Sequence, residues 1–264
     1  MPAIDTNVDR LDSDLALIRE AAEEAGHIAL RYFGNSPEVW LKDGSSPVSE
    51  ADIAIDRFLC ESLTAARPDY GWLSEETADS PERLSARRVF VVDPIDGTRA
   101  FIDGRDSWCV SIAVVEAGRA IAGVLECPAR KEHFHAQAGR GAFLDGKEIA
   151  VRKAGWHPVI GGPKAMIEAV PANLRARLQT TGYIPSLAYR VATIARGEID
   201  GTFVKPNAHD WDLAAADLIL HEAGGGILDA SLERPDYGGR NVRHGALVAG
   251  SGPLLDELAQ TLAT

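Results

Sequence analysis

Apolar residues recur every three or four positions in the first part of the chain, a spacing that predicts helices. One such stretch covers residues 15–33, and the polar run 12–14 can cap its start. A second begins near Ser49 and runs to residue 68, with Asp52 three positions after the candidate cap Ser49. The pattern predicts two helices joined by the polar loop KDGSSP, and it places Asp52 in a first helical turn.

From residue 88 the pattern changes to short runs rich in β-branched residues. Glycine-bearing turns separate these runs, which read RVFVVD, WCVSIAVVEAG, RAIAGVLECP, EHFHAQA and GAFLDGKEIAV. Strands joined by such short turns pair as hairpins, so the middle of the chain is expected to form an antiparallel sheet.

Past about residue 154 the pattern alternates between the two kinds of element. It predicts a strand at VIGG, helices over 163–179, 187–196 and 211–223, strands at GGILDA and ALVAGS, and a closing helix from Leu254. The fold class is therefore α/β. We expect two halves, 1–153 and 154–264, with no flexible linker between them.

Composition narrows the function. The 264 residues are 45% hydrophobic and carry a formal charge of −12, which opposes binding to a nucleic-acid polymer or an anionic membrane. No apolar run approaches the roughly 20 residues of a membrane span, and the acidic N-terminus does not resemble a signal peptide, so a cytoplasmic protein is expected. The three cysteines are scattered and predict neither a disulfide framework nor a thiolate zinc site.

Candidate chemistry concentrates in the sequence DPIDGT, which directly follows the apolar run RVFVV. Two carboxylates, Asp93 and Asp96, can converge there only if the turn brings them together, and they would repel each other unless a cation lay between them. Gly97 allows the backbone to approach an anion, and the amides of Gly97 and Thr98 can donate to phosphate oxygens. The alternative is an ordinary turn in which the aspartates cap backbone amides.

Two further acidic positions favour the metal interpretation. Glu75 and Glu76 end the apolar stretch WLSEE, and Asp212 stands at the start of the helix predicted over 211–223. Each alone has a plain reading, as a solvated turn or a helix cap. Together they offer Mg²⁺ the oxygen ligands that it prefers, with no competing Cys/His cluster.

WLSEET, VVDPIDGT and HDWDLAAADLILHEAGG resemble, in order and spacing, three motifs of the inositol monophosphatase family of metal-dependent, lithium-sensitive phosphatases, and SPVSEAD resembles a fourth segment. The resemblance implies an αβαβα layered sandwich and hydrolysis of a phosphate monoester by metal-activated water. It implies two to three Mg²⁺ ions, one held by Glu75, Asp93 and the carbonyl of Ile95, a second held by Asp93, Asp96 and Asp212, and a weaker third sharing Glu75. It also implies that Thr98 and Asp52 help Glu75 to activate water.

The resemblance also bears on the substrate, a small phosphorylated metabolite. Inositol-specific members carry a glutamate about seven residues before the WD aspartate, where this chain has Lys205. A cation there suits a substrate with a second negative group, although Lys205 can also be a solvated loop residue. Arg99, directly after Thr98, is similarly more typical of bisphosphate nucleotidases and histidinol-phosphate phosphatases. Substrate contacts are expected at Asp96, Gly97, Thr98, Lys205 and Asp212.

Several functions therefore stay open. A 3′(2′),5′-bisphosphate nucleotidase is placed first, an inositol monophosphatase second and a histidinol-phosphate phosphatase third. A regulatory or RNA-processing protein that acts through contacts rather than catalysis is the alternative of a different class, but a binding protein has no physical need for this cluster of carboxylates. A homodimer is a further expectation from the family.

Overall fold

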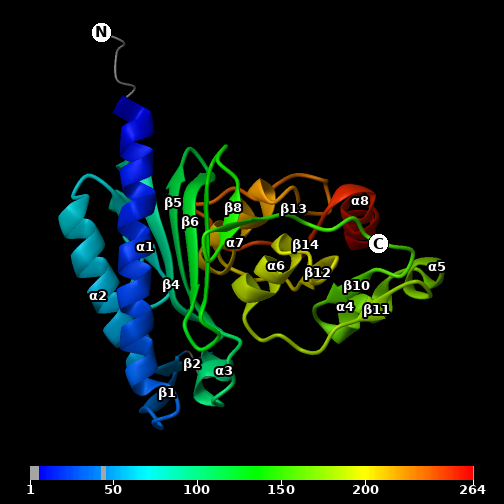
Figure 1. Cartoon of the computed structure of the whole chain (residues 1–264), viewed down its shortest axis with the longest axis horizontal. Helices are drawn as coiled ribbons and strands as arrows, with labels where there is room; N and C mark the ends of the chain where they lie inside the picture. The colour runs from blue at the N-terminus through cyan, green and yellow to red at the C-terminus, as the bar shows by residue number, and fades with distance from the viewer. Residues whose placement is uncertain (1–5, 43–45, 264) are drawn as a thin grey trace.

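The computed structural model describes residues 6–42 and 46–263, which form five stacked layers (Figure 1). Helices α1 (Thr6–Tyr32) and α2 (Glu50–Ala66) form the outer layer on one side. Along the chain between these helices, two short strands, β1 (Val39–Lys42) and β2 (Ser46–Ser49), pair with each other in antiparallel orientation. Both predicted N-terminal helices are confirmed, while the ends of the predicted loop KDGSSP belong to these strands.

The second layer is a seven-stranded sheet of order β3-β4-β5-β6-β7-β8-β9. Neighbouring strands are antiparallel from β4 onward, as predicted, whereas β3 pairs with β4 in parallel. The strands span β3 (Gly71–Ser74), β4 (Arg88–Asp96), β5 (Cys109–Glu116), β6 (Arg119–Cys127), β7 (Glu132–Gln137), β8 (Ala142–Leu144) and β9 (Lys147–Ile149). A short 3₁₀ helix, η1 (Pro81–Ser85), leads into β4.

Helices α6 (Leu187–Ala195) and α7 (Asp210–Glu222) form the central layer, and a five-stranded sheet of order β11-β10-β12-β14-β13 forms the fourth. Its strands are β10 (Val159–Gly161), β11 (Gln179–Thr180), β12 (Gly201–Val204), β13 (Gly226–Leu228) and β14 (Leu247–Gly250). The outermost layer contains α4 (Lys164–Ala169), α5 (Ala172–Arg175) and α8 (Gly252–Gln260), with η2 (Thr261–Ala263) at its end.

Alternation of side chains along the strands explains the layering. In β4 the side chain of Phe90 packs with α1 and α2, while Val89 and Val91 pack into the core that holds α6 and α7. A third core joins the five-stranded sheet to α4, α5 and α8. The αβαβα arrangement is therefore confirmed. The division at residue 153 stays a prediction, because α6 and α7 share one core with the first sheet.

One predicted element is wrong. The single helix expected over 163–179 is two short helices, α4 and α5, followed by the strand β11. Pro171 separates the helices, because proline lacks an amide donor and disfavours helical backbone in the residue before it. Val170 is accordingly extended, with ψ of 152°. No helix in the described part of the chain is both long and apolar enough to cross a membrane.

Candidate active site

The carboxyl end of β4 brings Asp93 and Asp96 together. All nine residues of this strand are buried, and its register against β5 slips by one residue between these two aspartates. In a regular strand, residues three apart point to opposite faces of the sheet, so the extra residue of the bulge at Pro94 is what allows both side chains to face the same side. The predicted convergence of the DPIDGT carboxylates is thus produced by a β-bulge.

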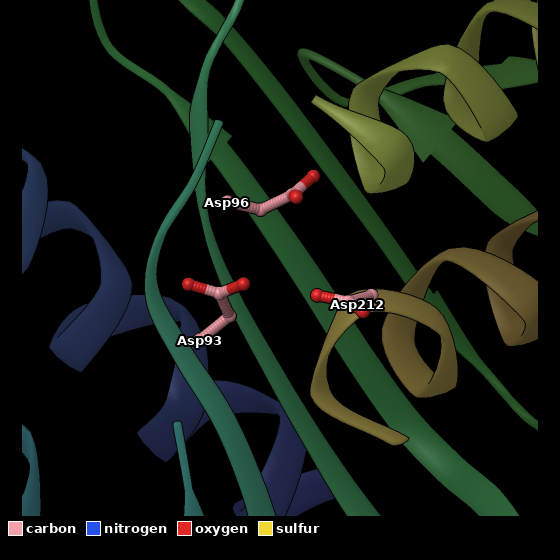
Figure 2. A group of neighbouring side chains, drawn as sticks. All are labelled: Asp93, Asp96 and Asp212. Carbon is pink, nitrogen blue, oxygen red and sulfur yellow. The ribbon is translucent and has the colours of Figure 1, made fainter. Parts of the chain in front are cut away.

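Asp212 joins them from the first turn of α7. The backbone N–H of His209 donates to Asp212 Oδ2 at 2.7 Å, which fixes the carboxylate at the start of the helix. One carboxylate oxygen from each of Asp93, Asp96 and Asp212 lies within 4.8 Å of the other two. Figure 2 shows the group, two side chains from the strand end and one from the helix. We refer to these three residues as the carboxylate cluster.

Two members of the cluster are buried and the third is half-buried: Asp93 is 1% exposed and Asp96 7%, while Asp212 is partly exposed. Within residues 6–42 and 46–263, Asp93 and Asp96 form no ion pair, and Asp212 Oδ2 lies 4.0 Å from Nδ1 of His209. Burial raises the pKa of Asp93 well above its ordinary value, and repulsion from Glu75 and Asp96 adds to the rise. Burial, followed by repulsion from Asp96, raises the pKa of Asp212 to about 7. Buried carboxylates of this kind are a suitable donor set for a hard divalent cation.

Glu75 lies in the same cavity but outside the group of three. It follows β3, and its N–H donates to the carbonyl of Val92 on β4 at 3.2 Å. Burial, with repulsion from Asp212, raises the pKa of Glu75 to about 8. Asp56 of α2 fixes the residues on either side of Glu75, because its carboxylate accepts hydrogen bonds from the hydroxyls of Ser74 and Thr77. Glu75 is therefore placed to share a cation with the cluster.

Asp52, Thr98 and Ile95 are connected by hydrogen bonds. The hydroxyl of Thr98 is 3.3 Å from Asp52 Oδ1 and 3.1 Å from the carbonyl oxygen of Ile95. Asp52 is fixed in turn by Ser49, the predicted cap of α2, whose N–H and hydroxyl donate to its Oδ2 at 2.8 and 2.6 Å. Burial raises the pKa of Asp52 to about 6. The N–H of Ile95 donates to Asp93 Oδ1 at 3.0 Å, which ties this chain of bonds to the cluster.

Gly97 is required by both its conformation and its surroundings. It has a left-handed backbone with φ of 96°, and a β-carbon there would lie 3.0 Å from that of Ser186 and 3.2 Å from the carbonyl oxygen of Ser107. Directly after it begins a short helix, α3 (Thr98–Ile102), which the sequence pattern did not predict. The amides of a first helical turn have no partner inside the helix, so those at Gly97 and Thr98 suit phosphate oxygens.

Sequence reasoning missed two groups that hold the site. The carboxylate of Asp96 accepts hydrogen bonds from the hydroxyl of Ser186 and from the N–H of Ala188 at 2.6 Å, so it caps the start of α6. Lys42 donates to the carbonyl of Glu75 and contacts Glu76 Oε2 at 3.0 Å. The sequence offered signals for both, a serine directly before a helical run and a lysine in the loop ahead of Asp52, but neither signal identifies its partner.

The cavity around the cluster has a volume of about 290 Å³. Its walls bring together the predicted residues Glu75, Asp93, Ile95, Asp96, Gly97, Thr98, Lys205 and Asp212, with Arg99, Pro47, Tyr183 and Pro185 beside them. Asp52 is reached through Thr98. Lys205 is exposed, and its charge lowers the pKa of Asp212, so it stands at the edge of this cavity rather than in open solvent.

Similarity to known proteins identifies the family of this chain. A model of the inositol monophosphatase family matches residues 10–264. An inositol-1-monophosphatase of Rhizobium meliloti is 31% identical over 94% of this chain and 95% of its own, and a 3′(2′),5′-bisphosphate nucleotidase CysQ of Aggregatibacter actinomycetemcomitans is 30% identical over 84% and 86%. The crystal structure of the extragenic suppressor protein suhB from Bartonella henselae superposes with a TM-score of 0.81 at 28% identity, covering 95% of this chain and 98% of that one. The chain therefore belongs to the inositol monophosphatase family, whose metal-dependent phosphatases hydrolyse phosphate monoesters.

Proposed function

We propose that this protein is a Mg²⁺-dependent phosphatase of a small phosphorylated metabolite that carries a second phosphate, with a 3′(2′),5′-bisphosphate nucleotide as the first candidate. The observation that carries the phosphatase activity is the carboxylate cluster, in which one oxygen from each of two buried and one half-buried aspartate lies within 4.8 Å of the other two. Such a cluster is stable in its ionised form only with a cation.

The assignment of the metal ligands is the one that the family resemblance implies, and the grouping of Asp93, Asp96 and Asp212 supports it. Glu75, Asp93 and the carbonyl oxygen of Ile95 would hold one Mg²⁺, and Asp93, Asp96 and Asp212 a second, with a weaker third ion sharing Glu75. When bound, these ions supply positive charge that screens the phosphoryl oxygens, favours deprotonation of water and stabilises the departing alkoxide.

The side chains of the protein orient the attacking water. The hydroxyl of Thr98 has one proton, and it donates this proton in a hydrogen bond to Asp52 or to the carbonyl of Ile95. Its lone pairs are then available to accept a hydrogen bond from the water. Glu75 lines the same cavity, and its ionised carboxylate can accept the proton that the water loses.

The choice of substrate rests on Lys205. An exposed cation at the edge of an acidic cavity favours a substrate with an additional anionic group over an uncharged polyol. Relatives named for inositol phosphates and for bisphosphate nucleotides match this chain at similar identity, so overall similarity does not decide between them. Inositol monophosphatase activity is the second candidate and histidinol-phosphate phosphatase activity the third.

The test is phosphate release with Mg²⁺ from four substrates, each compared by kcat/KM. They are adenosine 3′,5′-bisphosphate (3′-phosphoadenosine 5′-phosphate), inositol 1-phosphate, histidinol phosphate and fructose 1,6-bisphosphate. We expect the adenosine bisphosphate to be the best substrate. A preference for inositol 1-phosphate that Lys205→Ala leaves unchanged would refute the assignment of substrate, and no phosphate release from any of them would refute the activity itself.

We also propose that the protein is a homodimer in the cytoplasm. The family resemblance supports the dimer, and the acidic composition is compatible with the location. Sedimentation equilibrium at micromolar concentration should give twice the 28.3 kDa of one chain, and a monomer would refute the proposal.

A further inference from the structure

A second cavity of about 300 Å³ adjoins the one that holds the carboxylate cluster. Four residues line both cavities, so the two form a continuous cleft with two lobes: Tyr183, Pro185, Lys205 and Asp212. The first lobe contains the three aspartates of the carboxylate cluster and Glu75. The second, which we call the arginine lobe, is lined by Pro163, Leu187, Arg190, Val204, Asn207 and Ala208 in addition to the shared residues.

Arg190 is the unusual member of this lining. It lies in α6 and is 8% exposed, and its guanidinium makes two hydrogen bonds, from Nε to Thr202 Oγ1 and from Nη1 to the carbonyl of Ile184, both at 2.9 Å. A guanidinium has five N–H donors, so three remain without a partner among the residues that the structure describes. These donors belong to a side chain that lines a cavity open to solvent.

The other buried arginines of the described chain are ion-paired. Arg83 is 3% exposed and pairs with Asp79 at 2.5 Å, and Arg88 is 3% exposed and pairs with Asp14 at 2.8 Å. Arg190 forms no ion pair across the described ranges. A buried charge without a partner is unfavourable, and protein interiors normally provide one. An anion entering the arginine lobe would supply the missing partner.

The surroundings of Arg190 are compatible with an anion. Burial lowers the pKa of Arg190, and the nearby carboxylate of Asp96 offsets part of this effect. Both oxygens of Asp96, however, already accept hydrogen bonds from the start of α6, from the hydroxyl of Ser186 and the N–H groups of Leu187 and Ala188. Asp96 therefore supports the charge of Arg190 at a distance without using its N–H donors.

We propose that Arg190 binds a second oxyanion group of the substrate, a phosphate or carboxylate on the alcohol that the phosphatase reaction releases. This inference rests on the proposed function, since the scissile phosphate would lie in the first lobe. Lys205, which lines both lobes, attracts the anion, and Arg190 fixes its position through the planar donors of its guanidinium. Leu187, Val204 and the exposed ring of Tyr183 provide apolar walls for the organic part of the substrate.

The experiment compares substrates that differ in one anionic group. Adenosine 3′,5′-bisphosphate is paired with adenosine 3′-phosphate, and fructose 1,6-bisphosphate with fructose 1-phosphate. In a third pair, phosphoserine carries a carboxylate that phosphoethanolamine lacks. The wild-type protein should prefer the more anionic member of at least one pair by about tenfold or more, the usual effect of a charged hydrogen bond. Arg190→Gln should remove most of that preference, and Arg190→Lys should restore part of it.

Matched controls separate a local effect from misfolding. Lys153→Gln removes an exposed cation that lines a different cavity, beside α8, and should leave the ratio of each pair unchanged. Circular dichroism and thermal unfolding identify variants that fail to fold. A wild-type preference for the less anionic member of every pair, or a preference that Arg190→Gln leaves intact, would overturn the proposal.

A binding measurement keeps the inference separate from the activity. Asp52→Asn retains all the proposed metal ligands, and calorimetry with Mg²⁺ gives its affinity for adenosine 3′,5′-bisphosphate and for adenosine 3′-phosphate without relying on turnover. Adding Arg190→Gln should weaken binding of the bisphosphate about tenfold more than binding of the monophosphate. Equal weakening of both would refute the role of Arg190. Absence of phosphate release from every substrate in the wild type would instead refute the proposed function.

Discussion

The two ends of strand β4 carry buried charges of opposite character. At its start, Arg88 contacts Asp14 at 2.8 Å, and Asp14 also accepts hydrogen bonds from Arg67 at 2.8 Å and from the hydroxyl of Tyr70 at 2.7 Å. At its other end, Asp93 and Asp96 lie buried beside further carboxylates, with raised pKa values. The first group of charges is balanced by the protein itself, and the second is not.

The balanced charges at the start of β4 stabilise the fold, whereas the unbalanced charges at its end indicate a binding site. A balanced network such as that of Asp14 holds α1, α2 and β4 in place and needs nothing from solution. An unbalanced cluster destabilises the fold that contains it, so its presence indicates that a ligand completes it. Arg190, the buried arginine without an ion pair among the described residues, is likewise an unbalanced charge. It is positive and lines the adjoining lobe, so the ligand that completes it is an anion.

Replacing one carboxylate at the unbalanced end should have the largest effect on activity. Asp93→Asn removes a ligand proposed for two metal ions, and kcat/KM for phosphate release should fall by about a thousandfold or more. At a pH where these carboxylates are ionised, the metal-free variant should be at least as stable as the metal-free wild type in urea unfolding, because one of several repelling charges is gone. Undiminished turnover in this variant would refute the metal assignment.

The same substitution at the balanced end should do the reverse. Asp14→Asn leaves Arg67 and Arg88 without a buried carboxylate that both contact, and should lower the free energy of unfolding by about 3 kcal/mol, as measured in urea. At low temperature, where the variant stays folded, kcat should change less than about threefold, because the damage lies at the opposite end of the strand. A loss of kcat comparable to that of Asp93→Asn would contradict the distinction between the two ends.

The unbalanced end should also make metal-free stability depend on pH. Glu75 and Asp212 have pKa values raised to about 8 and about 7, so between pH 6.5 and 8.5 the folded protein holds protons that the unfolded chain has lost. Stability must then fall as pH rises through this window, by about 1–2 kcal/mol. Below pH 6.5, His135 has the opposite effect on stability. Burial lowers its pKa to about 4, so the folded protein binds fewer protons there than the unfolded chain, and stability rises with pH. Thermal unfolding in EDTA and in Mg²⁺ measures the effect, which Mg²⁺ should abolish.

A smaller effect is expected from the cation next to the cluster. Lys42 contacts Glu76, and its charge lowers the pKa of Glu75. Lys42→Met should therefore raise the pKa of Glu75 further and reduce the fraction of Glu75 that is ionised at neutral pH. The Mg²⁺ concentration for half-maximal activity should rise about two- to fivefold at pH 7 and less at pH 9, in keeping with a partly exposed ion pair. Lys131→Met, far along the chain at the turn before β7, is the matched control. An equal rise at both pH values would argue that Lys42 acts only by holding the loop.

Local signals in the sequence anticipated much of the fold and the centre of the site. The cap at Ser49, the apolar periods of α1 and α2 and the β-branched runs are fixed by neighbours in the chain, so they could be predicted. The family resemblance supplied the residues of the cluster, and the hydrogen bond between Thr98 and Asp52 agrees with the pairing it implied.

The features that were missed depend on contacts between distant segments. Nothing near Asp96 in the sequence indicates that it caps a helix 90 residues later at Ser186, and Arg190 looks like an ordinary polar position in a helical run. The strand β12 is only four residues long, and its burial under α6 and α8 decides its structure. Pro171 is different, because proline is itself a local signal against one continuous helix over 163–179, and α4 and α5 lie on either side of it.

The central claim is that the carboxylate cluster is completed by a divalent cation, and calorimetric titration of the metal-free protein with Mg²⁺ at pH 7 tests it most directly. Repeating the titration in two buffers of different ionisation enthalpy gives the number of protons released. We expect binding with net release of protons, since Glu75 and Asp212 are partly protonated without metal, and we expect Asp93→Asn to lose most of the affinity. Absence of Mg²⁺ binding, or equal affinity in Asp93→Asn, would contradict the account.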